Sequence, residues 1–176
     1  LDYEKAAIAR DRIKALTQIQ TSQKINQTNL KDADVISIYK ETGKTCIQVF
    51  FFRSKQNWGN QAFYPKHDTD DKIKDILSSF ISQFYENKTV PSLIITNNEI
   101  NERQLLEKTL SNKENKQIII KKAKTKNEIS ISKLAEKNAK QTLTQKLIQS
   151  DTNNNLIENL ATKFKLNNNI DLIEVY

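Results

Sequence analysis

The sequence has few of the residues that crosslink or interrupt a chain. Its 176 residues include one cysteine, two glycines, two prolines and no methionine. A single cysteine excludes a disulfide framework and a zinc site built from cysteines. So few glycines and prolines argue against a long flexible linker or a collagen-like chain. No apolar run approaches the roughly 18 residues that a membrane-spanning helix needs. We therefore expect one domain, with or without a helical appendage, in the cytoplasm.

The positive charge of the chain is unevenly distributed. The formal net charge is +7, and the stretch 113–146 alone contains ten lysines and three glutamates. A basic segment of this kind favours an anionic partner such as nucleic acid. A lysine-rich helix face in solvent explains the charge equally well, so charge alone leaves both interpretations open. No signal peptide opens the chain, and because it begins at Leu1 rather than methionine, we expect a fragment.

Hydrophobic periodicity predicts alternating strands and helices. The clearest helix is 70–85, with apolar residues at Ile73, Ile76, Leu77, Phe80, Ile81 and Phe84. Further helices are expected at 2–24, 101–112, 131–148 and 154–164, and strands at 35–39, 45–53, 61–66, 92–96, 117–121 and 171–176. Turns are expected at 41–44 and 56–60. After the first helix the order is β-β-β-α-β-α-β-α with an extra C-terminal helix, an α/β arrangement that matches the ribonuclease H-like topology.

That topology raises the question of a two-metal catalytic site. Such a site needs carboxylates in the middle of the first strand, on the first helix and at the end of the fourth strand. The first strand has Ser37 at its centre and Asp34 only near its start, and the fourth strand ends in Asn97 and Asn98. The sequence therefore predicts a domain with no catalytic residue and no metal site.

Four single residues each permit a functional and a structural interpretation. His67 stands in an acidic turn and is expected to be solvated, and Cys46 is expected to be a small core residue. Trp58 is either a hydrophobic plug in its turn or a surface on which a base stacks. Arg53, at the end of a strand, either meets a phosphate or pairs with an acid.

The opening residues LDYEKAAIARDRIKAL resemble the second helix of the UVR motif, a short helical hairpin, through Tyr3-Glu4, Ala6-Ala7 and Arg10-Asp11. Later segments resemble the UvrC family in the same order along the chain. These segments are Asp32–Ile36, Val49–Arg53, Ile81–Tyr85 with Pro91, Leu134–Ala139 and Ile173-Glu174. The family's basic loop of the form P-x-R-G-x-K is replaced by Ala123–Glu128, which lacks the proline, arginine and glycine. Lysines preserve the charge of that loop but not bidentate phosphate contacts.

The resemblance implies a piece of the DNA-incising subunit of the UvrABC nucleotide excision repair system. It implies a partial UVR helix at 1–27, a non-catalytic ribonuclease H-like domain at 28–166, and the start of a truncated endonuclease domain at 167–176. The implied partners are UvrB and damaged double-stranded DNA. No cofactor is expected in this piece, which we expect to be monomeric, whereas the whole protein is expected to use a divalent metal.

The resemblance also implies site residues. Those expected to bind UvrB are Tyr3, Glu4, Ala7, Arg10 and Asp11. Those expected to bind DNA are Arg53, Lys121, Lys122, Lys124 and Lys126. Two other functions stay open: an autonomous nuclease of ribonuclease H type, and a UVR-type adaptor that binds a protein without touching DNA.

Overall fold

β-branched and aromatic residues in the first part of the domain form an antiparallel meander. The computed structural model describes residues 30–163, and its first three strands are β1 (Asp32–Glu41), β2 (Lys44–Arg53) and β3 (Gln56–Phe63). Two-residue turns at Thr42-Gly43 and Ser54-Lys55 connect them, and all four of these residues have positive φ. Turns of this handedness match the twist of the strands that they join.

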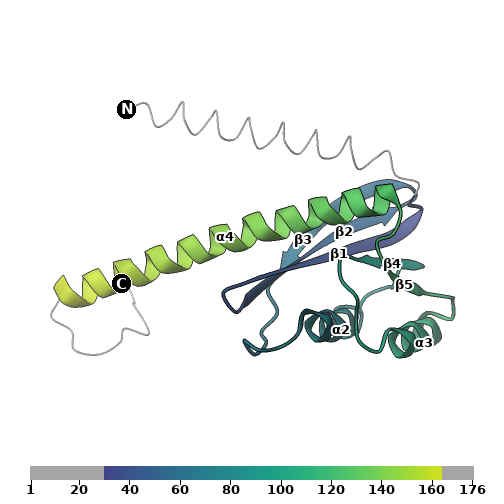
Figure 1. Cartoon of the computed structure of the whole chain (residues 1–176), viewed down its shortest axis with the longest axis horizontal. Coiled ribbons are helices and arrows are strands. Elements are labelled where there is room, and N and C mark those ends of the chain that lie inside the picture. The colour runs from purple at the N-terminus through teal and green to yellow at the C-terminus, as the bar shows by residue number, and fades with distance from the viewer. Residues whose placement is uncertain (1–29, 164–176) are drawn as a thin grey trace, which may run out of the picture.

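Two parallel strands extend the meander into a five-stranded sheet. β4 (Leu93–Thr96) pairs in parallel with β1, and β5 (Ile119–Lys122) pairs in parallel with β4, so the order is β3-β2-β1-β4-β5. Helix α2 (Ile73–Phe84) leads into β4, and α3 (Arg103–Glu114) connects β4 to β5. Both helices cover one face of the sheet, and α4 (Lys126–Lys163) crosses the opposite face (Figure 1). This arrangement confirms the expected α/β class and order of elements.

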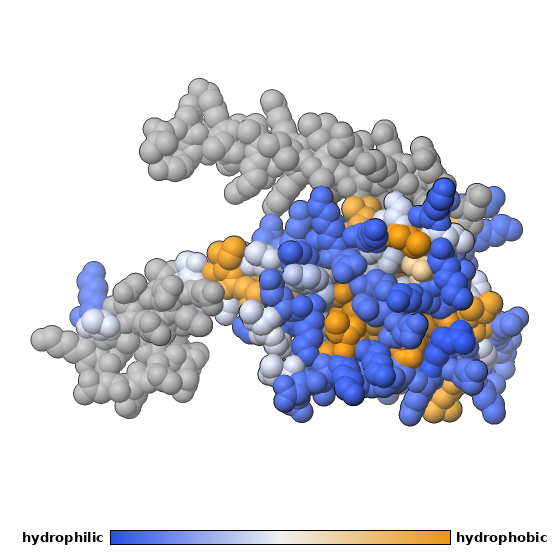
Figure 2. Space-filling view, in the orientation of Figure 1, coloured by the Kyte–Doolittle hydropathy of each residue, from blue (hydrophilic) through white to orange (hydrophobic). Residues whose placement is uncertain are grey.

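The larger core lies between the sheet and α2. Phe63 of β3 and Phe80 and Phe84 of α2 form an aromatic cluster, with ring centroids 5.2 to 5.4 Å apart. Aromatic pairs in tilted or offset arrangements contribute stability beyond their buried area. Ile36, Ile38, Ile47, Val49, Leu77 and Ile81 complete the centre of this layer. Figure 2 shows apolar residues exposed among hydrophilic ones on the part of the domain that lies below α4 in this view.

Small residues allow α4 to approach the opposite face of the sheet closely. Ala135 and Ala139 of α4 are fully buried, as is Ser37 of β1. The Ser37 hydroxyl donates a hydrogen bond to the backbone oxygen of Ser132, 2.9 Å away. Phe50 and Phe52 of β2 fill the remaining space beneath the helix.

The structure corrects two expectations about the elements, and two others concern residues that it does not describe. The predicted turn at 56–60 belongs to β3, because the reversal occurs at Ser54-Lys55. The two helices expected at 131–148 and 154–164 are one continuous helix, since the polar stretch between them contains no glycine or proline to break it. The helix expected at 2–24 and the strand expected at 171–176 lie outside the described residues. No helix within 30–163 is long and apolar enough to cross a membrane.

Candidate nucleic-acid interface and its polar framework

The four lysines predicted to bind DNA lie together where β5 ends and α4 begins. Lys121 and Lys122 are the last two residues of β5, Lys124 lies in the connection, and Lys126 is the first residue of α4. Lys122, Lys124 and Lys126 are exposed, whereas Lys121 is half-buried. We call these four residues the basic cluster. Their proximity follows from a connection of three residues between strand and helix.

An arginine from α3 joins the basic cluster around a cavity. The cavity has a volume of about 290 Å³ and lies between Arg103, Glu99 and three lysines of the cluster, Lys121, Lys122 and Lys124. The Arg103 guanidinium donates to the backbone oxygen of Ile120 at 3.2 Å and pairs with Glu107 at 3.5 Å. The carboxyl ends of β4 and β5 border this cavity, and that edge of an open α/β sheet is where ligands commonly bind. The sequence analysis did not predict Arg103 as a site residue. The one feature that could have indicated it is its position on the helix that connects β4 to β5.

Glu128 fixes the start of α4 and one lysine of the cluster. Its carboxylate accepts hydrogen bonds from the backbone amides of Lys124 and Thr125 at 3.0 and 3.2 Å, and from the Lys121 ammonium at 2.7 Å. The Thr125 hydroxyl accepts a reciprocal bond from the Glu128 amide, which completes a capping box. Burial raises the pKa of Glu128, but the bonds from Lys121 and the two amides outweigh it and lower the pKa below its ordinary value. An anion at this surface would therefore meet lysine and arginine side chains rather than the amides of Lys124 and Thr125.

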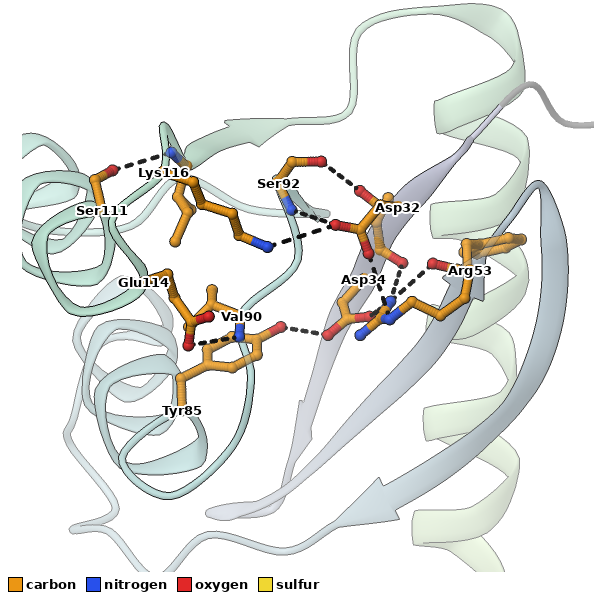
Figure 3. A network of polar contacts seen from close by, with 12 residues as sticks. Asp32, Asp34, Arg53, Tyr85, Val90, Ser92, Ser111, Glu114 and Lys116 are labelled. Carbon is orange, nitrogen blue, oxygen red and sulfur yellow. Dashed lines mark hydrogen bonds and ion pairs between the residues drawn. The ribbon is translucent and has the colours of Figure 1, made fainter.

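Arg53 is engaged by carboxylates on its own sheet (Figure 3). Its Nη1 donates to Oδ1 of Asp34 at 2.7 Å, and its Nε lies 3.4 Å from Oδ1 of Asp32. Nη1 also lies within hydrogen-bond distance of two backbone oxygens, those of Ala33 and Phe52. Of the two interpretations of Arg53, the structure supports pairing with an acid. Contact between Arg53 and phosphate stays a prediction. Arg53 would have to make that contact while keeping the bonds described above.

Asp34 ties the sheet to α2. Its carboxylate is 1% exposed, and its second oxygen, Oδ2, accepts a hydrogen bond of 2.6 Å from the hydroxyl of Tyr85, the C-cap residue that follows α2. Burial raises the pKa of Asp34, and this effect outweighs the lowering by the bonds from Arg53 and Tyr85. Asp32 extends the same network by accepting from the backbone amide of Ser92 at 2.9 Å, and it lies 3.8 Å from the Lys116 ammonium.

The residues of this network do not fit a two-metal site. One oxygen of Asp34 is bonded to Arg53 and the other to Tyr85. Within residues 30–163, no three histidine, cysteine, aspartate or glutamate side chains come together in a way that could hold a metal ion. The carboxylates on β1 therefore serve the fold in this structure.

Three other residues singled out in the sequence have clear surroundings. His67 is half-buried, with Nε2 2.6 Å from the Thr45 hydroxyl and Nδ1 2.7 Å from the backbone oxygen of Asp68, so it is only partly in contact with solvent. Cys46 is buried as predicted, and burial raises the pKa of its thiol to about 11. Trp58 is 72% exposed, which excludes a hydrophobic plug. The five residues predicted to bind UvrB lie outside the described part of the chain.

Comparison with known proteins identifies the family. Residues 32–146 match the UvrC ribonuclease H-like domain family. The whole chain is 42% identical to the UvrABC system protein C of Bartonella quintana and 40% identical to that of Ruegeria sp., and it covers 26% and 28% of those proteins. It thus spans about a quarter of the length of these curated relatives. The chain belongs to the UvrC family, and residues 32–146 form the ribonuclease H-like domain of that family.

Proposed function

We propose that this chain is part of the DNA-incising subunit of the UvrABC nucleotide excision repair system, acting in the cytoplasm. Its ribonuclease H-like domain would be a scaffold that contacts DNA without cutting it. The observation that carries this proposal is the basic cluster, which has three exposed lysines, lies at the carboxyl ends of two parallel strands and is joined there by Arg103. Family membership supports the place of the chain in the repair system.

The side chains of this surface suit the phosphate backbone better than the edges of bases. Lysine is a flexible point charge, and its contacts with phosphate position a protein on DNA without reading sequence. Arg103 adds a guanidinium to the lining of the cavity, and Ile120 and Glu107 hold it there. We therefore expect binding that is weakly dependent on sequence and strongly dependent on salt.

Replacement of all four lysines of the basic cluster by glutamine should weaken DNA binding and flatten its salt dependence. Each lost lysine–phosphate contact should reduce the slope of log affinity against log salt by about 1. The slope should therefore fall by up to about 4 in the variant K121Q/K122Q/K124Q/K126Q. Fluorescence anisotropy with a labelled duplex over a series of salt concentrations measures both quantities.

The matched control removes the same charge elsewhere. Lys44, Lys66, Lys72 and Lys74 are all exposed, and none of them belongs to the basic cluster or lines its cavity. Their replacement by glutamine should leave most of the salt slope in place. Equal losses in the two variants would show that only net charge matters, and an unchanged slope in the first variant would refute the interface. Magnesium-dependent nicking of the same duplex would instead favour the autonomous nuclease.

We also assign UvrB as the protein partner, through the UVR-type pattern at the start of the chain. In the variant A7E, a carboxylate replaces one of the small residues expected to contact a partner helix. We expect A7E to abolish binding of the chain to purified UvrB in isothermal titration calorimetry. The variant K108E, on the exposed side of α3, should bind as the parent chain does. If the parent chain shows no binding to UvrB, this partner is wrong for the chain.

A further inference from the structure

The most exposed of the large hydrophobic side chains in the described domain is an indole on the edge strand. Trp58 of β3 is 72% exposed, and β3 forms one border of the sheet. The basic cluster adjoins the strand at the other border, β5, so the two features lie on opposite edges of the sheet. A tryptophan normally stabilises a fold by burying a large apolar area, and Trp58 buries little of its own.

The exposure of Trp58 is built into the backbone of β3. Phe51 of β2 pairs with Gly59, whereas the next residue, Phe52, pairs with Asn57. Trp58 therefore has no partner across the strand pair and forms a β-bulge. The side chain of Asn57 accepts a hydrogen bond of 2.9 Å from the backbone amide of Gly59, and Gly59 has a φ of +120° that other residues rarely adopt. Bulges of this kind re-aim a side chain.

Protection of the sheet edge explains the bulge but not the indole. A bulge on an edge strand discourages pairing with another chain, and a charged or polar side chain would serve that purpose without exposing apolar surface. Neighbouring residues of β3 follow this rule, since Asn57 and Asn60 are polar. The tryptophan at the bulge therefore needs a reason outside the fold.

Lysines are exposed at the turn that leads into the strand of Trp58. The turn before β3 presents Lys55, which is exposed and has a φ of +65°. The amide of Lys55 donates to the backbone oxygen of Lys31, which brings a second exposed lysine to the turn. A shallow hollow of about 450 Å³ lies between Lys31, Lys55, Ser54, Arg53 and Asp32. Asp32, its one acid, is already paired with Arg53.

We propose that Trp58 is a platform on which an unpaired base of DNA stacks, with Lys31 and Lys55 contacting the adjacent phosphates. Aromatic side chains bordered by lysines bind single-stranded nucleic acid in this way, because every base has a face that stacks. This inference rests on the proposed DNA binding and adds a second contact at the opposite edge of the sheet. It would direct the domain to DNA whose strands have been separated.

The chain offers a direct readout because Trp58 is its single tryptophan. Titration of the full chain with oligothymidylate should quench the tryptophan fluorescence, and a fully paired duplex should quench it much less. The variant W58A should lose roughly 5- to 100-fold in affinity for labelled oligothymidylate, whereas W58F should lose less, because a phenyl ring still stacks. Since Trp58 is so exposed, W58A should unfold at the same urea concentration as the parent chain.

The outcomes separate this inference from the proposed function. If W58A binds oligothymidylate as tightly as the parent, the platform is wrong, while loss of duplex binding in the basic-cluster variant would still support the proposed function. If the basic-cluster variant binds duplex normally while W58A loses oligothymidylate, the platform stands and the basic surface fails. Fluorescence that changes with purified UvrB and not with oligothymidylate would show a protein docking surface and overturn the platform.

Discussion

Replacement of Arg53 by alanine should lower the free energy of unfolding by about 3 kcal/mol at neutral pH. The loss arises because Asp34, 1% exposed, keeps its buried carboxylate while losing its guanidinium partner. The expected value is at the lower end of the usual range for a broken buried pair, since the Arg53 side chain is 29% exposed and water can enter its place. Urea denaturation followed by circular dichroism measures the effect.

The pH dependence of this variant identifies the cause. Burial raises the pKa of Asp34 above its value of 3.8 in the unfolded chain, so the folded state binds more protons between these two values. Ionised Asp34 therefore destabilises the fold at pH values above the pKa of Asp34 in the folded state. This cost is relieved as the pH falls through that pKa. Without Arg53 this pKa should rise further, and the deficit of the variant should shrink on acidification.

A second substitution provides the control. In D34N the buried charge is absent, so R53A added to D34N should cost less than R53A alone. A deficit that is independent of pH and equal in both backgrounds would contradict the charge argument. It would show instead that Arg53 acts through its contacts with the backbone oxygens of Ala33 and Phe52.

Replacement of Phe50 by alanine should cost about 3–5 kcal/mol. Phe50 is fully buried and lies under α4 with Ile131 and Ala135. The small residues along the contact already bring the helix close to the sheet, so it cannot move much further to fill the space that the ring leaves. The cavity should persist, and urea denaturation should show the loss of stability.

The matched control lies on the other side of the molecule. Leu105 of α3 is 59% exposed, and L105A should change stability by no more than about 0.5 kcal/mol. A loss below about 1.5 kcal/mol in F50A would mean that α4 settles onto the sheet after all.

Local pattern was enough to predict most of the elements. The expected helix at 70–85 is found as Ile73–Phe84, and five of the six apolar residues that defined it are buried. That prediction needed only the spacing of apolar residues, which places them on one side of any α-helix. The same reasoning failed between 148 and 154, where a polar stretch was interpreted as a break. Polar side chains place a helix segment in solvent, but they do not interrupt its backbone hydrogen bonds.

The sequence by itself determined the order of elements, the position of the excess charge and, through its resemblance, the family. It could not decide which side chains meet across the sheet. Arg53 finds Asp34 because β1 and β2 pair in one register, and a shift of one residue would turn either side chain to the other face. Arg103 reaches the lysines because α3 packs beside β5, and Trp58 is exposed because a single residue of β3 has no partner. These contacts join residues far apart in the chain, so only the tertiary structure could decide them.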